Sequence, residues 1–358
     1  MIKTKNILIS IIIPTRNRAS FLKETIHSLT GQDFPPNNYE ILIIDNGSTD
    51  ATRAVALEAK RAFSHHQIRY VYEPVFGLLS GRHRGIKETR SELLTFVDDD
   101  IVADKYWLAC IIESFQDSKV QLVTGRSLPF FKQRPPNWLD WLWSTSQWGL
   151  SCGYLSLIDF GESVKKIDPG YVWGLNFSIR KHTLLSLGGF HPDAYPKHLL
   201  AFRGDGETGL TDRAREERCI ALYNPSALIH HQIHAQRLSL TYFRNRSYLQ
   251  GISDAYTSIR KSEKEACALE IGSVDENMHQ PLLFAEGEVV SSACLNREVL
   301  IERLRLDYER GYQRHLILVR RSPVLMNWVY KPDYWDYRLP NLKCRLAGEN
   351  CERSYWSF

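Results

Sequence analysis

The stretch Leu93-Leu-Thr-Phe-Val-Asp-Asp-Asp100 joins a mainly apolar run to three consecutive carboxylates. The run predicts a buried strand, and acids directly after it lie at the carboxyl edge of a sheet, where open α/β sheets bind ligands. Like charges this close resist ionising together unless a cation or hydrogen-bond donors accompany them. Mg²⁺ and Mn²⁺ prefer carboxylate and phosphate oxygens, so the triplet indicates a metal–phosphate site. The alternative is that the acids cap a helix over residues 101–115.

The composition limits the class of protein. The chain has 358 residues, 43% of them hydrophobic, which suits one large globular domain or two smaller ones. Its net charge of +4 does not suggest a nucleic-acid partner. The seven cysteines are scattered without a Cys-x-x-Cys pair, which favours free thiols and a cytoplasmic location. No apolar run reaches the roughly 18 residues that a membrane-spanning helix requires.

Strand-like and helix-like segments alternate through the first hundred residues. Single helices between strands imply right-handed crossovers and a mostly parallel central sheet flanked by helices. Ser20 is the expected cap of the first helix. The expected strands and helices are, in chain order, residues 7–13, 20–29, 40–44, 51–63, 68–72, 81–89 and 93–97.

Polar residues gather where these strands end. Pro14 and Asn17 follow the first strand, Asp45 ends the second, and Gly81-Arg-His-Arg-Gly85 opens a helix before the Asp98–Asp100 triplet. On a parallel sheet such strand ends face one crevice. Taken separately, Asp45 has the alternative role of a turn residue, and the two arginines that of a solvated helix face. Together the four features indicate a nucleotide-sugar site.

Four segments carry a family resemblance: Ser10-Ile-Ile-Ile-Pro-Thr-Arg-Asn17, Glu40-Ile-Leu-Ile-Ile-Asp-Asn-Gly-Ser-Thr-Asp50, Gly77-Leu-Leu-Ser-Gly-Arg-His-Arg-Gly-Ile86 and Phe96-Val-Asp-Asp-Asp100. They resemble glycosyltransferase family 2, an inverting family with the GT-A fold, over roughly residues 8–240. The resemblance implies an enzyme that moves a sugar from a nucleoside-diphosphate sugar, UDP-linked in our expectation, to a hydroxyl acceptor. That acceptor is a sugar, a lipid-linked molecule or another hydroxyl compound of polysaccharide or glycoconjugate biosynthesis. His83 departs from the asparagine usual in the family.

The resemblance also implies roles for single residues. Pro14 and Asp45 line the base pocket, Arg82 faces the nucleotide, and Asp98 lies toward the ribose or the metal. Asp100 resembles the acid that binds Mn²⁺ or Mg²⁺. Of the triplet, Asp99 is also the remaining candidate for the helix cap. The expected nucleotide contacts are Pro14, Thr15, Arg16, Asn17, Asp45, Arg82, Asp98 and Asp99.

A catalytic base is expected because the acceptor hydroxyl must lose a proton as it attacks. The segment Arg203-Gly-Asp-Gly-Glu-Thr-Gly-Leu-Thr-Asp-Arg213 resembles the acidic motif of the family. Matching Leu210 and Arg213 to that motif makes Glu207 the base. Asp205 is the alternative, because the two glycines leave the register open. Without catalysis, this segment is a glycine-rich turn before a helix over 210–218.

Further contacts are expected downstream. The segment Val172-Trp-Gly-Leu-Asn176 resembles the strand that walls the acceptor pocket, so Trp173 and Asn176 are candidate acceptor contacts, with a core position as the alternative for Trp173. His231, after the last expected strand, is a candidate ligand of the metal or the diphosphate together with Asp100 and Asp98. The arginines that follow are candidates for phosphate binding or for a solvated helix face: Arg237, Arg244 and Arg246.

The rest of the chain gives coarser predictions. We expect a GT-A domain over 1–240, with a nucleotide-binding half over 1–100 and an acceptor half over 101–240, and a mainly helical extension over 241–358. Tryptophans at 138–148 suit an acceptor loop or the core, and the basic, aromatic tail suits peripheral contact with the inner face of a membrane. Two other functions fit the sequence less well. A sugar-phosphate nucleotidyltransferase lacks its glycine-rich loop here, and a non-catalytic nucleotide-sugar-binding module is at odds with the intact acids.

Overall fold

The computed structural model describes residues 7–262 and 296–340 of the chain. Its first part alternates strands and helices as predicted, with boundaries that differ by a few residues. α3 begins three residues before Gly81, and no side chain caps α1, whose N-cap is Arg18, so the expected cap at Ser20 is wrong. The elements are β1 (Ile9–Thr15), α1 (Ala19–Thr30), β2 (Tyr39–Asp45), α2 (Thr52–Ala62), β3 (Gln67–Tyr72), α3 (Leu78–Glu88) and β4 (Leu93–Val97).

The helix expected over 101–115 is in fact a strand, a turn and a shorter helix. Residues 101–103 form β5 because they pair antiparallel with β12, so Asp99 caps no helix. The elements that follow are β5 (Ile101–Ala103), α4 (Trp107–Ser114), β6 (Val120–Phe131), η1 (Asn137–Leu142), β7 (Ser144–Thr145), β8 (Leu150–Cys152), η2 (Gly153–Leu155), β9 (Leu157–Asp159), β10 (Lys165–Ile167), η3 (Pro169–Tyr171), β11 (Asn176–Arg180), α5 (Lys181–Ser186), η4 (Lys197–Phe202), α6 (Thr208–Glu216), β12 (Ile220–Ile233) and η5 (Ala235–Leu238).

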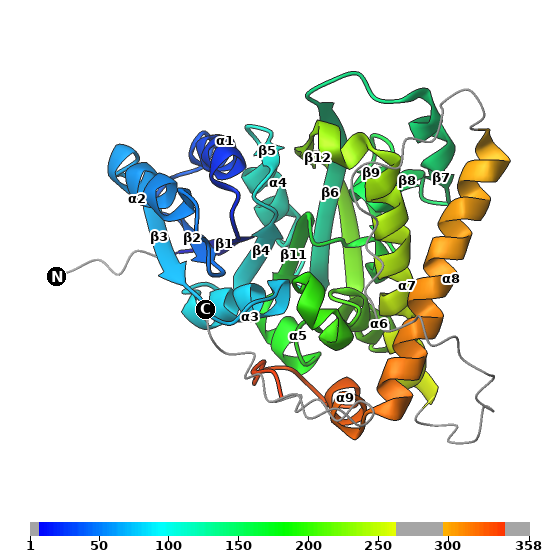
Figure 1. Ribbon diagram of the computed structural model, residues 1–358. Coiled ribbons are helices and arrows are strands. Elements are labelled where there is room, and N and C mark those ends of the chain that lie inside the picture. Colours follow the sequence, from blue (N-terminus) through cyan, green and yellow to red (C-terminus); the bar gives the residue numbers. More distant parts are fainter. Residues whose placement is uncertain (1–6, 263–295, 341–358) are drawn as a thin grey trace.

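One mixed sheet runs through the described part of the chain, in the order β3-β2-β1-β4-β11-β6-β9-β8-β7 (Figure 1). The first four strands in this order are parallel, and Thr15 lies opposite Asp45 at their carboxyl ends. β11 is antiparallel to both β4 and β6. β12 is parallel to β6 and also pairs with β5 and β10. The fold is therefore the predicted α/β class, with β1 to β4 forming its parallel half.

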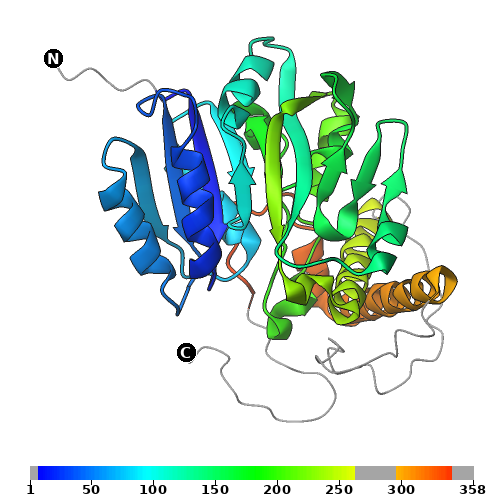
Figure 2. The ribbon, with the colours of Figure 1, turned by 90° about the horizontal axis from the view of Figure 1, so that it is seen from above.

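Helices cover both faces of the parallel strands, which explains why β1, β2 and β4 are mainly apolar and buried, whereas β3 at the edge is more polar. In β1, the side chains of Ile9, Ile11 and Ile13 join one core cluster, which includes residues of α1, α2 and α4. Ile12, on the opposite face, joins a second cluster that includes residues of α3, α5 and α6. Figure 2 shows the helices on the two sides of the sheet. This arrangement leaves the carboxyl ends of β1 and β4 free to form a site.

The C-terminal helices are α7 (Leu240–Ser262), α8 (Arg297–Arg321) and α9 (Pro323–Val329). α7 and α8 lie side by side along the second half of the sheet (Figure 1). None of the described helices is long and apolar enough to cross a membrane. Trp328 and Tyr334, two tail aromatics expected to touch a membrane, are instead buried in the core cluster that contains residues of α3. Residues 341–358 of that tail lie outside the described residues.

Candidate active site

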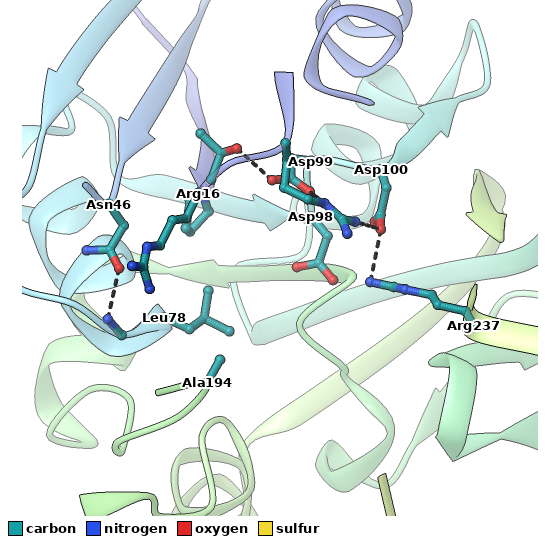
Figure 3. A pocket seen from close by; sticks show the side chains of 12 residues that line it. Arg16, Asn46, Leu78, Asp98, Asp99, Asp100, Ala194 and Arg237 are labelled. Atoms are coloured by element: carbon teal, nitrogen blue, oxygen red, sulfur yellow. Dashed lines mark hydrogen bonds and ion pairs between the residues drawn. The ribbon is translucent and has the colours of Figure 1, made fainter. Parts of the chain in front are cut away.

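A cavity lies where β1 and β4 end, and it brings together residues from six separate parts of the chain (Figure 3). Six of the predicted site residues line it: Pro14, Thr15, Arg16, Asp98, Asp99 and Asp100. Arg237, a candidate for phosphate binding, also lines it. The other lining residues were not predicted from the sequence: Arg18, Asn46, Gly77, Leu78 and Ala194. Gly77 and Leu78 lie at the start of α3. They were missed because the helix was expected to begin at Gly81, three residues after its observed start.

Two arginines neutralise the carboxylates of the triplet. Arg18 donates from Nε to Asp99 Oδ1 at 3.2 Å, and its Nη2 contacts Asp100 Oδ2. Arg237 Nη2 lies 3.0 Å from the same Asp100 oxygen. Thr15 donates its hydroxyl to Asp99 at 2.6 Å. Asp98 is half-buried, and in Figure 3 its carboxylate lies between Arg16 and Arg237.

The three acids differ in how readily they ionise. Burial raises the pKa of Asp98, and the charge of Asp100 adds to this rise. Burial likewise raises the pKa of Asp99 to about 7, although the Arg18 charge opposes it. For Asp100, burial acts in the same direction, but Arg237, His231 and Arg18 together hold its pKa well below its usual range. Asp100 is therefore the acid of the triplet that stays ionised at all relevant pH values.

His231 faces Asp100 in a form suited to binding a cation. It lies within β12, not after it as expected, and its Nδ1 is 2.8 Å from the carbonyl oxygen of Leu155. Since a carbonyl only accepts, Nδ1 carries the proton, and Nε2, which meets the donor Nη1 of Arg237, carries a lone pair. This Nε2 lies 3.5 Å from Asp100 Oδ1, a buried oxygen without a hydrogen-bond partner in the described residues.

Asp100 and His231 thus fit two positions of a divalent-ion site. Within residues 7–262 and 296–340, no group of three or more His, Cys, Asp or Glu side chains is placed to hold a metal. Mg²⁺ is commonly bound by one or two carboxylates, with water and substrate phosphates completing its shell. The donor set therefore suits an ion that arrives with a diphosphate.

Three predicted nucleotide contacts are not among the residues that line the cavity. Asn17 joins two loops, because its side chain accepts from the Thr49 amide at 2.7 Å. Asp45 is buried and accepts from the Tyr70 hydroxyl at 2.7 Å and the Ser48 amide at 2.8 Å. Arg82 turns toward Glu207, with Nη1 at 3.0 Å from Oε2.

The two candidate bases have different surroundings. Asp205 has a side chain only 3% exposed, and its oxygens bind His191 Nδ1 and the Thr257 hydroxyl, each at 2.7 Å. Glu207 directly precedes α6, and its side chain is 24% exposed. Besides Arg82, it accepts the Gly174 amide at 3.1 Å. Glu207 is therefore the more accessible of the two carboxylates.

Comparison with known proteins assigns this arrangement to a family. Residues 10–183 match the family model of glycosyl transferase family 2. These residues, just under half of the chain, belong to that family. It is 30% identical over 117 residues to glycosyltransferase AglE of Haloferax volcanii, an alignment that covers 33% of this chain and 38% of AglE. It is 31% identical over 136 residues to the poly(ribitol-phosphate) beta-N-acetylglucosaminyltransferase TarS of Staphylococcus aureus, covering 36% of this chain and 24% of TarS.

A solved structure extends the family 2 assignment to the fold. The mannosyltransferase PcManGT from Pyrobaculum calidifontis shares 15% sequence identity and a TM-score of 0.50, and the match covers 87% of this chain and 74% of that chain. At this identity the likeness concerns the fold alone, which is the expected GT-A fold. The family 2 alignments span well under half the length of these curated relatives.

The two predicted acceptor contacts, Asn176 and Trp173, differ in how far they are buried. Asn176 is 1% exposed and accepts from Trp107 Nε1 while donating to the Ala227 carbonyl, each at 3.0 Å. Both ends of its amide are occupied in the core, so the expected acceptor contact is wrong. Trp173 is half-buried, and its Nε1 donates to the Gly170 carbonyl at 2.9 Å. Trp173 is therefore partly exposed, and the next residue, Gly174, contacts Glu207 through its amide, so the acceptor contact of Trp173 stays a prediction.

Proposed function

We propose that the chain is an inverting glycosyltransferase that uses a nucleoside-diphosphate sugar, UDP-linked, with Mn²⁺ or Mg²⁺, and transfers the sugar to a hydroxyl acceptor. One observation carries this proposal. Asp100 lines the cavity and has a buried oxygen that lies 3.5 Å from His231 Nε2, while Arg82 acts electrostatically on both Asp98 in the cavity wall and Glu207. The donor-side acid Asp98 and the accessible base Glu207 thus both interact with the guanidinium of Arg82.

On the donor side, Asp100 and His231 would hold the divalent ion. When bound, such an ion neutralises the charge that gathers on the departing diphosphate. Arg18 and Arg237 lie beside the same carboxylate, so their remaining N–H groups are available to the phosphate oxygens. Pro14, Thr15 and Arg16 line the cavity and would position the nucleoside.

On the acceptor side, Glu207 would take the proton of the attacking hydroxyl. Burial acts to raise the pKa of Glu207, but the charge and hydrogen bond of Arg82 hold it below its ordinary value. The carboxylate is consequently ionised and ready to accept a proton at neutral pH. A base in this position typically accelerates transfer about 10²–10⁴-fold.

The names of similar proteins support a nucleotide sugar. TarS is named a beta-N-acetylglucosaminyltransferase, and PcManGT was solved with GDP-Man and Mn²⁺. We infer that this chain also takes a nucleotide sugar with a divalent ion. Four further points remain parts of this proposal: a UDP-linked donor, a cytoplasmic site of action, membrane contact and the domain division at residue 240.

The test combines a donor screen with one substitution. Purified protein is incubated with UDP-, GDP- and dTDP-sugars, with and without Mn²⁺, and release of the nucleoside diphosphate is measured. Asp100→Asn should reduce turnover by about 100-fold or more, because the ion contributes several kcal/mol of charge stabilisation. It should also remove the Mn²⁺ dependence of UDP binding in calorimetry.

Asp33→Asn is the matched control, because Asp33 is exposed and its ion pair is a surface contact with Lys105 at 3.7 Å. This variant should behave as wild type. Unchanged turnover in Asp100→Asn would refute the metal assignment. Release of pyrophosphate from nucleoside triphosphate and sugar phosphate would instead identify a nucleotidyltransferase.

A further inference from the structure

Arg82 occupies an unexpected position for a residue whose helix begins at the donor cavity. It is 3% exposed, does not line the cavity, and donates to Glu207 Oε2 at 3.0 Å. We propose that Arg82 is a positioning residue, which orients the catalytic base Glu207 and keeps its carboxylate ionised, and that it does not bind the nucleotide. This inference rests on the proposed function, since it names the residue that positions Glu207, the base of that function.

The packing around the pair fixes its geometry. The Arg82 guanidinium lies over the ring of Phe190, 4.7 Å from its centroid. The absence of a side chain at Gly174 provides the space that the ion pair needs. A Cβ there would lie 2.0 Å from Arg82 Nη2 and 3.2 Å from Glu207 Oε1. The Gly174 amide also donates to that Oε1 at 3.1 Å. Each carboxylate oxygen therefore has its own donor, and the carboxyl group is held in one orientation.

Charges from several elements act on this carboxylate. Arg82 comes from α3, and Arg203, at the end of η4, is close enough to interact electrostatically with Glu207. Asp193 neutralises Arg203 through a 2.8 Å ion pair, and the oxygens of Asp205 contact His191 Nδ1 and the Thr257 hydroxyl, each at 2.7 Å. Among the described residues, Arg82 is thus the cation that directly contacts Glu207. Its removal should make Glu207 harder to ionise.

The experiment compares Arg82→Met and Arg82→Lys with Arg84→Met. Arg84 lies on the same helix but pairs with Glu88, and its side chain is 37% exposed, so this control should be unaffected. In Arg82→Met, hydrolysis of the UDP-sugar found in the donor screen should fall by about 100-fold, as for a misplaced catalytic group. The acidic limb of its pH–rate profile should move to higher pH by about 1 pH unit or more. UDP binding with Mn²⁺ should stay within about threefold of wild type, a change of less than 1 kcal/mol.

Two further variants distinguish positioning from other roles. Arg82→Lys keeps the charge but not the planar guanidinium. Its acidic limb should therefore lie at the wild-type pH, while its rate should lie between those of Arg82→Met and wild type. Gly174→Ala displaces the guanidinium without removing it and should move the limb in the same direction as Arg82→Met. A tenfold loss of UDP affinity with an unmoved limb would show a nucleotide contact and overturn the proposal. A lower melting temperature with an unmoved limb would overturn it in favour of a structural role.

A measurement without turnover separates this inference from the proposed function. The Glu207 carboxyl can be titrated by ¹³C NMR, with its resonance assigned through Glu207→Gln. Loss of the Arg82 contact should raise its midpoint, even if the wild-type protein hydrolyses none of the nucleotide sugars. An unchanged midpoint in Arg82→Met would overturn the inference, whereas absent hydrolysis alone would refute only the glycosyltransferase function.

Discussion

Two carboxylates two residues apart, Asp205 and Glu207, show how surroundings divide roles. Asp205 is enclosed, and the charge and hydrogen bond of His191 help to hold its pKa below its ordinary value despite burial. Its oxygens hold the loop 203–206 to His191 and to Thr257 of α7. Glu207 has an exposed portion and fixed donors. We therefore assign Asp205 to loop structure and Glu207 to proton transfer.

This assignment predicts opposite phenotypes for two conservative substitutions. Glu207→Gln should retain donor binding and lose about 10²–10⁴-fold in transfer, because an amide takes no proton. Asp205→Asn should lower the free energy of unfolding by about 1–3 kcal/mol, because a charged hydrogen bond in the core is lost. Calorimetric UDP binding, nucleotide release and urea unfolding measure the three quantities. If Asp205→Asn alone abolished transfer at unchanged stability, Asp205 would be the base.

At the level of elements, the crossing of α7 and α8 depends on two glycines. A Cβ on Gly251 would lie 2.0 Å from the Tyr308 carbonyl oxygen, and one on Gly311 would lie 2.0 Å from that of Tyr248. The backbones therefore meet directly. A buried ion pair, Arg244 Nε to Asp307 Oδ2 at 2.8 Å, lies along the same contact.

Gly251→Ala should consequently destabilise the protein, although alanine favours helices. The methyl group forces the helices apart, and overpacking of this kind costs about 1–3 kcal/mol. Gly153→Ala is the control, since a Cβ there meets nothing within 4 Å. Urea unfolding compares the two variants with wild type. Equal midpoints for Gly251→Ala and wild type would contradict the tight crossing.

The sequence predicted elements better than their contacts. Local periodicity and turn residues sufficed for β1 to β4, and the three acids after Val97 line a cavity at the strand ends, while their role in a site stays a prediction. The helix expected at residue 101 failed because pairing with β12, about 130 residues later, determines that β5 is a strand. Asn176 failed because its polar side chain satisfies core groups of Trp107 and Ala227, contacts that no local pattern reveals.

At the scale of the whole molecule, His83 connects the C-terminal segment to α3. Its Nε2 accepts the Phe190 amide at 3.0 Å, so its Nδ1 donates to the Tyr334 carbonyl at 3.0 Å. The ring of Trp335 stacks on it at 4.4 Å. The departure from the family asparagine at this position therefore coincides with the docking of the C-terminal segment.

Buried histidines also set how the stability of the whole molecule depends on pH. Burial lowers the pKa of both His83 and His315 to about 3, from 6.5 in an unfolded chain. Between these values the unfolded state binds more protons, so stability falls as pH falls below 6.5. The loss approaches about 1.4 kcal/mol per pH unit for each histidine.

Urea unfolding at pH 7, 6 and 5 tests this dependence. His83→Gln, whose side chain does not titrate, should show a shallower decline than wild type by about the contribution of one histidine. His65→Gln is the control, because His65 is exposed. Parallel declines for wild type and His83→Gln would show that His83 does not contribute.

The His83–Tyr334 contact has a consequence for how the protein is made. Its partners are 251 residues apart in the chain. At translation rates of about 5–20 residues per second, some 13–50 s pass between the synthesis of His83 and that of its carbonyl partner. Throughout this interval α3, the helix that also carries Arg82, is on the ribosome without its final covering. α3 thus lacks this contact until residue 334 has been synthesised.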